Sequence, residues 1–177
     1  MATWKSRGSR GSLLEESINR TNEKYREHGL ALVQKIPTPI TPMEMNGRMI
    51  TKAFFAQKST VDYMGIVQGI PVCFEAKESK KKRFPFDSIH EHQVKFMEEY
   101  EKQDGCAFLI IDFTVEDKCF YVPFRIFKEF WDKGKNGGKK SFKFDELDEK
   151  WLIKKGNNVI IPYLEKIKLD MEERDSC

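Results

Sequence analysis

The segment from Val61 to Lys77 constrains the fold most strongly, because it predicts two adjacent strands joined by a tight turn. Residues 70 to 77 alternate between two faces, one with Val72, Phe74 and Ala76 and the other with Cys73, Glu75 and Lys77. This alternation is the pattern of a half-buried strand. Gln68 and Gly69 form a two-residue connection of the kind that closes an antiparallel hairpin. With this turn, counting back along both strands places Asp62 directly opposite Glu75.

Two facing carboxylates need a positive partner. Asp62 and Glu75 would have their Cβ atoms roughly 5 Å apart, and like charges at that distance repel each other. A divalent cation would remove the repulsion, because Mg²⁺ binds one or two carboxylates together with water and substrate phosphates. Lys77 shares the face of Glu75, where it could orient or deprotonate an attacking water and stabilise charge on a phosphate. The segment therefore predicts phosphodiester hydrolysis, and the alternative is an exposed hairpin with a solvated salt bridge.

The composition fits one globular domain. The chain has 177 residues, of which 40% are hydrophobic, enough to bury a sizeable core. It contains no run of about eighteen apolar residues and no apolar leader at its start, so we expect a cytoplasmic protein without a membrane partner. The cysteines form no C-x-x-C pair, and three of the four lie in apolar runs. We therefore expect neither disulfides nor a zinc site.

Basic residues are concentrated in three segments that could contact phosphate. The first sixty residues hold more Lys and Arg than Glu, including Arg10 and Lys35, and residues 133 to 143 contain five lysines among glycines. For that lysine-rich loop, a solvated surface is an equally good interpretation. The third segment is the run Lys80, Lys81, Lys82 and Arg83. Because it begins three residues after Lys77, we predict that it contacts DNA phosphates.

The remaining patterns predict a mixed central sheet flanked by helices, an α/β fold. We expect a flexible basic arm over residues 1–11, a single domain over 12–170 and a charged tail over 171–177. Helices are predicted over 13–28, from Ser88 to about 103 and over 125–133, and strands over 30–36, 106–113, 118–124 and 158–163. Residues 37 to 52 are predicted to protrude, because the proline-rich run 37–42 disfavours a sheet interior and Asn46-Gly47 favours a hairpin turn.

Two polar residues on the predicted helices need an explanation. Glu15 lies three residues after Ser12, so a capping box at the start of the first helix would account for it without any metal. Ser88 and Glu91 have the same spacing at the start of the second helix. Gln93 falls on the apolar stripe of that second helix, so its amide is carried toward the interior or toward a cleft and needs hydrogen-bond partners there.

These residues together resemble the PD-(D/E)xK nucleases, which have a restriction-endonuclease-like core. Within that superfamily the chain is similar to the RecU family of Holliday junction resolvases. The matching motifs run along nearly the whole chain: Arg10-Gly11, Thr21-Asn22, Pro37-Thr-Pro39, Asp62-Tyr63, Phe74-Glu-Ala-Lys-Glu78, Phe84-Pro85, His90-x-His92-Gln93 and Phe130-Trp-Asp132. One departure is Val61, where this family usually has a threonine.

The resemblance implies a homodimeric endonuclease of bacterial or phage origin. Such an enzyme resolves four-way junction DNA in recombination and repair, by paired nicks that need Mg²⁺ or, in its place, Mn²⁺. Carried over by position, Asp62 and Glu75 would be metal ligands, Lys77 would stand by the attacking water, and Glu15 would complete the metal site. Gln93 would be auxiliary. The protrusion would be the family's stalk, with Arg48 and Lys52 as candidate phosphate contacts.

Two other functions remain open from the sequence. One is a sequence-directed or damage-directed endonuclease of the same superfamily, because the predicted core reports hydrolysis and not the form of DNA that is cut. The other is a junction-binding recombination factor without catalysis. A substrate panel separates the first from a resolvase, and loss of cleavage on substitution of Glu75 separates the second.

Overall fold

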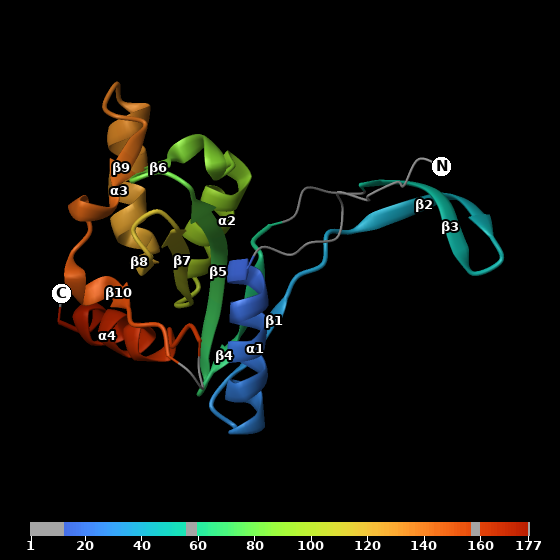
Figure 1. Ribbon diagram of the computed structural model, residues 1–177, viewed down its shortest axis with the longest axis horizontal. Helices are drawn as coiled ribbons and strands as arrows, with labels where there is room; N and C mark the ends of the chain where they lie inside the picture. Colours follow the sequence, from blue (N-terminus) through green and yellow to red (C-terminus); the bar gives the residue numbers. More distant parts are fainter. Residues whose placement is uncertain (1–12, 56–59, 157–159, 177) are drawn as a thin grey trace.

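A six-stranded mixed sheet forms the centre of the molecule in the computed structural model, which describes residues 13–55, 60–156 and 160–176 (Figure 1). The strand order is β1-β4-β5-β7-β8-β10. β5 and β7 run parallel, and the other neighbours in this sheet run antiparallel. The strands are β1 (Leu32–Lys35), β4 (Tyr63–Val67), β5 (Ile70–Ser79), β7 (Cys106–Phe113), β8 (Lys118–Pro123) and β10 (Leu152–Ile153). The predicted mixed sheet is confirmed.

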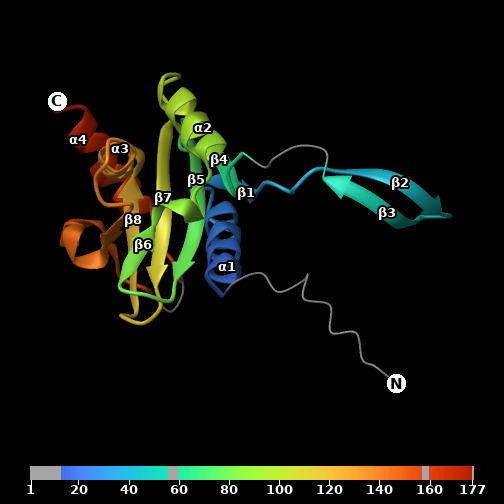
Figure 2. The same cartoon turned by 90° about the horizontal axis from the view of Figure 1, so that it is seen from above.

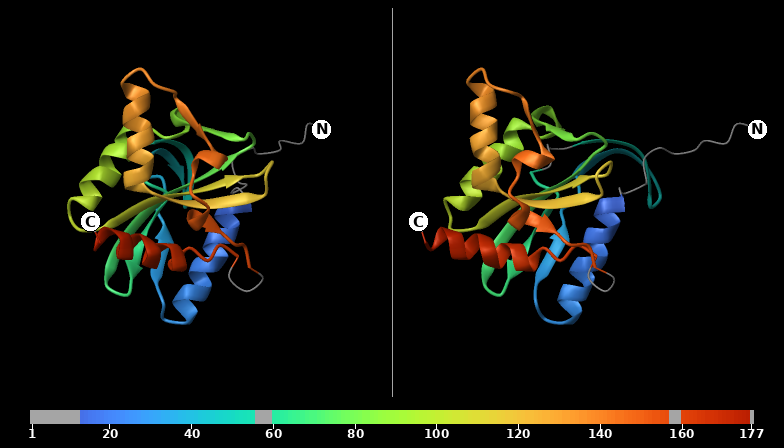
Figure 3. Two further views of the ribbon diagram at one scale, coloured as in Figure 1. Left: turned by 90° about the vertical axis from the view of Figure 1, so that its left-hand side faces the viewer. Right: turned by 60° about the vertical axis from the view of Figure 1, so that its left-hand side comes forward.

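Helices cover both faces of this sheet and make a three-layered body (Figures 2 and 3). On one face lie α1 (Leu13–Glu27) and α4 (Leu164–Arg174), and on the other lie α2 (Glu91–Glu101) and α3 (Phe124–Lys135). Smaller elements complete the described chain: strands β6 (Arg83–Pro85) and β9 (Ser141–Lys143), and the 3₁₀ turns η1 (Phe86–Ser88), η2 (Phe144–Glu146) and η3 (Glu149–Trp151). No helix in the described residues is long and apolar enough to cross a membrane.

The β4–β5 hairpin has the predicted register. Val67 pairs with Ile70 and Tyr63 pairs with Phe74. Gln68 and Gly69 both have positive φ, 47° and 92°, as a tight two-residue hairpin turn requires. Glu75 therefore lies one position beyond the last paired residues of the ladder, opposite Asp62.

β5 is buried on both faces, so the expectation of a half-buried strand is wrong. Every residue from Val72 to Ala76 is buried. The reason is tertiary: β5 pairs in parallel with β7 through the α2 crossover, and parallel strands are covered by helices on both sides. Glu75 is consequently an interior residue.

A row of aromatic rings crosses the sheet on the face covered by α1 and α4. Tyr63, Phe74, Phe108, Tyr121 and Trp151 stack in that order, with ring centroids 4.7, 4.7, 4.3 and 5.6 Å apart. Near-parallel aromatic pairs of this kind contribute about 0.5–1.5 kcal/mol each beyond the area they bury. The row links four strands and the 3₁₀ turn before β10, and it fixes how the sheet strands sit side by side.

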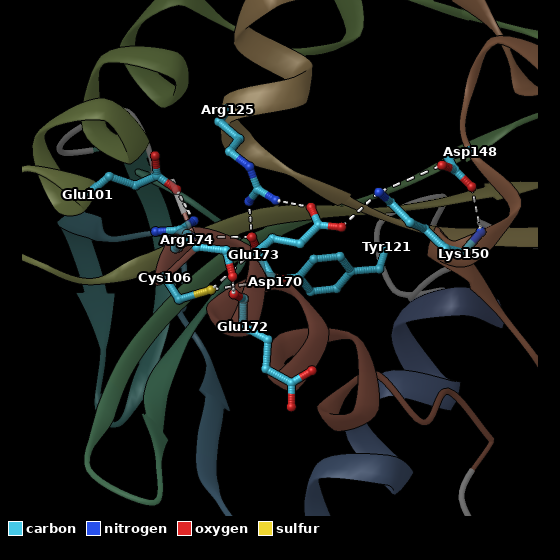
Figure 4. Close-up of polar contacts among 11 residues, drawn as sticks. Glu101, Cys106, Tyr121, Arg125, Asp148, Lys150, Asp170, Glu172, Glu173 and Arg174 are labelled. Carbon is cyan, nitrogen blue, oxygen red and sulfur yellow. Dashed lines mark hydrogen bonds and ion pairs between the residues drawn. The ribbon is translucent and has the colours of Figure 1, made fainter.

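The C-terminal helix α4 is held by a buried aspartate (Figure 4). The side chain of Asp170 is fully buried and accepts hydrogen bonds from the Tyr121 hydroxyl at 2.7 Å and from the guanidinium groups of Arg125 and Arg174. The helix continues through residues 171–174, which had been predicted to form a tail, and Arg174 also pairs with Glu101. The predicted final strand is wrong for residues 160–163; residues 157–159 lie outside the described part.

The predicted protrusion is an antiparallel ribbon that extends away from the body (Figure 1). It consists of β2 (Ile40–Asn46) and β3 (Met49–Phe55), so it reaches beyond the predicted end at residue 52. Asn46 pairs with Met49, which makes Gly47 and Arg48 the turn residues in place of Asn46 and Gly47. Pro42 lies in the ribbon beside an irregularity in the register, where a proline is tolerated.

Candidate active site

Asp62 and Glu75 face each other, and each carboxylate accepts a backbone N–H from the opposite strand. The amide N–H of Asp62 donates to Oε2 of Glu75 at 3.0 Å, and Oδ2 of Asp62 accepts the N–H of Ala76 at 3.1 Å. These side-chain bonds replace the main-chain ladder at the point where β4 begins. Two carboxylates are therefore held on adjacent strands by bonds that also order the backbone beneath them.

Lys77 is the positive group at this pair. Its Nζ lies 2.5 Å from Oε1 of Glu75 and 4.0 Å from Oδ2 of Asp62. The Glu75 side chain is 0% exposed and that of Lys77 is 29% exposed. The alternative of a solvated surface salt bridge is therefore wrong, and the three groups line a partly enclosed polar site.

Gln93 also donates to Glu75, from the start of α2. Its Nε2 donates to Oε1 of Glu75 at 2.7 Å, and its own Oε1 accepts the backbone N–H of His90 at 3.0 Å. His90 is the residue that caps α2, so the predicted capping box of Ser88 and Glu91 is wrong. The buried amide thus connects the start of α2 to the β5 carboxylate.

The environment of the site disfavours the ionised form of Glu75 and favours the ionised form of Lys77. Burial and the nearby charge of Asp62 raise the pKa of Glu75 to about 7, although Lys77 and Gln93 act in the opposite direction. Burial opposes the charge on Lys77, but Glu75, Asp62 and Glu15 outweigh it and raise the pKa of the ammonium. Lys77 is therefore a protonated hydrogen-bond donor at neutral pH.

Glu15 approaches the site from the other face of the sheet. Its carboxylate pairs with Lys35 at 2.5 Å, and its backbone carbonyl accepts from the Tyr63 hydroxyl at 3.4 Å. Its charge is close enough to contribute to the raised pKa of Lys77. Ser12, the proposed partner of Glu15 in a capping box, lies outside the described residues.

Glu78 follows Lys77 in β5 but lies outside the candidate site. Strand alternation turns it away from Glu75 and Lys77, and on that opposite face its Oε1 accepts the backbone N–H of Leu14 at 2.9 Å. The bond anchors the first turn of α1 to β5. An acidic side chain is favourable next to the start of a helix, and this preference is the feature of the sequence that could have indicated the contact.

The residues predicted to contact DNA are dispersed over the surface. Lys80 and Lys81 are exposed just beyond β5, Lys82 pairs with Glu116 at 2.7 Å, and Arg83 donates to Ser141 at 3.0 Å. Arg48 lies in the ribbon turn, Lys52 pairs with Glu44 on the ribbon at 3.6 Å, and Lys35 pairs with Glu15. Arg10 lies outside the described residues.

The donor set fits a hard divalent cation. Oδ2 of Asp62 holds the Ala76 N–H, and the Asp62 side chain remains 23% exposed, so a carboxylate oxygen faces the open side of the site. Mg²⁺ and Mn²⁺ favour oxygen ligands and need only one or two carboxylates. Within the described part of the chain, no three His, Cys, Asp or Glu side chains are grouped to hold a metal.

Known proteins are similar to this chain along most of its length. The family model described as RecU, recombination protein U, matches residues 9–169. A protein of Geobacillus sp. (strain WCH70) named Holliday junction resolvase RecU is 38% identical over 147 residues, which are 80% of this chain and 73% of that protein. A protein of Pediococcus pentosaceus with the same name is 36% identical over 167 residues, 90% of this chain and 83% of that protein.

Among solved structures, the chain is similar to Hjc of Archaeoglobus fulgidus, a Holliday junction resolvase from an archaeal hyperthermophile. The TM-score is 0.42 at 9% sequence identity, and the alignment covers 65% of this chain and 78% of that chain.

Proposed function

The chain belongs to the RecU family, and we propose that it is a divalent-metal-dependent endonuclease that resolves Holliday junctions in recombination and repair. The observation that supports this most directly is the pair of facing carboxylates of Asp62 and Glu75 with the Lys77 ammonium beside them. Relatives of this chain are named Holliday junction resolvases. We propose Mg²⁺ as the cofactor, with Mn²⁺ able to replace it.

Each residue has a distinct role in this proposal. Asp62 and Glu75 would hold the cation, which when bound would supply a water of lowered pKa and a positive charge toward the scissile phosphate. Lys77 donates hydrogen bonds to the attacking water or to a phosphate oxygen, and its ammonium opposes the negative charge that develops there. Gln93 holds Glu75 in position through the bond to its Oε1. Glu15 is the candidate for a third carboxylate.

The ribbon and a second copy of the chain complete the proposed resolvase. A four-way junction must be cut on two opposing strands, which needs two active sites, so we propose a homodimer. We propose that the β2–β3 ribbon enters the open centre of the junction, where Arg48 at the ribbon turn and Lys52 would contact phosphates. Val61, in place of a threonine, is fully buried, so any hydroxyl contribution would come from Thr60.

Cleavage of defined DNA substrates tests this function. We expect the purified protein with Mg²⁺ to make paired nicks in a mobile four-way junction, to leave a linear duplex of the same sequence intact and to be inactive with a chelator. Asp62→Asn and Glu75→Ala should abolish cleavage while junction binding, measured without Mg²⁺, is retained. Glu129→Ala, an exposed acid on α3, is the matched control and should cleave normally.

Each alternative function gives a different result in the same assay. Equal cutting of linear duplex and junction would identify a sequence-directed or damage-directed endonuclease. Junction binding without cleavage by the wild-type protein under any divalent cation would identify a non-catalytic recombination factor. Unchanged cleavage by Glu75→Ala would reject the proposed site.

A further inference from the structure

Two lysine-rich segments that are far apart in the sequence are joined into one surface by strands β6 and β9. Arg83 pairs with Lys143, Phe84 with Phe142 and Pro85 with Ser141. The first segment leaves β5 directly after the active-site residues, and the second follows α3. The two segments come side by side near the same end of the body (Figure 1).

The short ladder has one buried face and one outer face. Phe84 and Phe142 are almost fully buried, with ring centroids 5.5 Å apart. Because side chains alternate along a strand, Arg83 and Lys143 lie together on the opposite, outer face. The hydrogen bond from Nε of Arg83 to the Ser141 hydroxyl at 3.0 Å also lies on this face.

Hydrogen bonds hold the backbone around the β6–β9 ladder in place. Ser79 is buried, and its hydroxyl bonds to the carbonyl of Arg83 at 2.7 Å, which fixes the loop between β5 and β6. The carbonyl of Lys140 accepts from Phe86 at 3.0 Å, and that of Lys82 accepts from Phe144 at 3.2 Å. Charges carried on this scaffold are therefore presented at nearly fixed spacing.

The charges on the scaffold are largely unneutralised. Many surface lysines of the described chain have a carboxylate partner, such as Lys95 with Glu99 and Lys168 with Glu172. By contrast, no carboxylate of the described residues lies within ion-pair distance of five exposed lysines here: Lys80, Lys81, Lys139, Lys140 and Lys143. We call these five lysines and Arg83 the β6–β9 strip.

We propose that the β6–β9 strip is a second DNA-binding surface, which holds the phosphate backbone of a duplex arm leading away from the cleavage site. This inference rests on the proposed function. The strip begins three residues after Lys77, a distance of roughly 10 Å for extended chain, so it lies within reach of a duplex held at the site. Rows of lysine without base-reading groups position a duplex and do not read its sequence. Lys139, Lys140 and Lys143 extend the contact beyond the run at 80–83.

Salt-dependent binding without divalent cations tests the strip separately from catalysis. The test variant is Lys139→Ala/Lys140→Ala/Lys143→Ala. The control is Lys95→Ala/Lys102→Ala/Lys168→Ala, which removes equal charge from α2, from the residue that follows it and from α4. Each lost phosphate contact lowers the slope of log affinity against log salt by about 0.9 for duplex DNA. We expect the slope for a linear duplex to fall by about 2 to 3 in the test variant and to be unchanged in the control.

Two further comparisons vary the length of the junction arms and replace the lysines by arginine. Wild-type affinity for four-way junctions should rise as the arms are lengthened, and the test variant should lose that gain. Lys139→Arg/Lys140→Arg/Lys143→Arg should restore it, because the positive charge is kept. Equal slopes for test and control variants would overturn the proposal. So would a loss of binding to phosphatidylserine vesicles or to an acidic peptide with duplex binding unchanged.

The experiments distinguish rejection of the proposed DNA-binding strip from rejection of the proposed endonuclease function. The proposal for the strip is tested by DNA binding alone. A protein that binds DNA but does not cleave it would therefore still test the strip. Conversely, a wild-type slope in the test variant alongside normal junction cleavage would reject the strip and leave the active site standing.

Discussion

The carboxylate of Glu78 accepts the backbone N–H of Leu14 at 2.9 Å, which joins the strand of the candidate active site to the first turn of α1. Glu78 follows Lys77 directly but points to the other face of the sheet. Tyr63, which follows Asp62, also points to that face and donates to Asn19 of α1 at 3.0 Å. Glu78 and Tyr63, the sequence neighbours of two site residues, therefore hold the helix that carries Glu15.

Substitution of Glu78 should loosen this attachment. Glu78→Ala removes an anionic acceptor from the start of α1, and we expect a loss of about 1–2 kcal/mol in the free energy of unfolding. Glu78→Gln keeps an acceptor oxygen and should lose roughly half as much. Urea unfolding measures both. Glu16→Ala, an exposed acid in the same helical turn, is the control, and an equal loss there would contradict a specific role for Glu78.

Gln93 should affect activity more than stability. Gln93→Ala removes a donor from Glu75, and loss of a partner that orients a metal-binding carboxylate typically lowers activity about 10–100-fold. The lost bond to His90 should cost only about 1 kcal/mol in unfolding free energy. Junction cleavage and urea unfolding measure the two effects, with Gln103→Ala at the exposed end of the same helix region as control. Full cleavage by Gln93→Ala would show that Glu75 does not depend on this amide.

The stability of the metal-free protein should depend on pH through Glu75. Because its pKa is raised from 4.5 to about 7 in the folded state, the folded protein retains a proton that the unfolded chain has already lost. The associated stability is present below about pH 4.5 and is lost as pH rises through about 7. Relative to Glu75→Gln, which does not titrate, wild type should lose up to about 3 kcal/mol across this range. Urea unfolding at pH 5 and pH 8 with a chelator measures the difference, and a pH-independent difference would refute it.

Asp170 should be essential for docking of α4. Asp170→Ala would remove the buried acceptor shared by Tyr121, Arg125 and Arg174 (Figure 4). Arg125 keeps Glu173 and Arg174 keeps Glu101, so the expected loss is that of a buried acceptor with donors left unsatisfied, about 2–3 kcal/mol. Glu172→Ala is the control, because this exposed side chain pairs with Lys168 at 3.8 Å on the outer side of the same helix, and its loss should cost less than about 0.5 kcal/mol. Thermal or urea unfolding measures both. A small loss for Asp170→Ala would mean that α4 is held mainly by its apolar contacts.

The ribbon should serve DNA binding and contribute little to stability. Its apolar side chains Met43, Met45, Met49 and Phe54 are 51% to 70% exposed, so they bury little area against the body. Shortening β2 and β3 by equal numbers of paired residues should leave the unfolding free energy within about 0.5 kcal/mol of wild type. The preference for four-way junctions over duplex, measured by competition binding, should fall. A large loss of stability would indicate that the ribbon packs on the body.

Local patterns were sufficient to predict the pieces of the site. Residue alternation and the Gln68-Gly69 turn gave the β4–β5 register, because a two-residue turn leaves one register in which the strands can pair. Helical periodicity identified Gln93 as a polar residue on an inward stripe. The motif set identified the family, since motifs in a fixed order along most of the chain do not arise from composition.

Interactions between distant segments were not visible in these patterns. β5 became an interior strand because α2 and the β7 pairing cover it, and this burial is what raises the pKa of Glu75. The end of α4 was predicted to be part of a charged tail. The positions that hold this helix, Ile167 and Asp170, include a charge whose partners, Tyr121 and Arg125, lie on other elements.

The amino-acid sequence by itself determined the hairpin that opposes Asp62 to Glu75 and places Lys77 on the same face, because both follow from alternation and a short turn. The tertiary structure alone decided that this hairpin is an interior feature. Packing of α2 on one face excludes water from Glu75 and brings Gln93 to it, while packing of α1 on the other leaves Glu15 paired with Lys35. The physical reason is that burial and charge pairing depend on which elements cover a strand, and no local pattern specifies them.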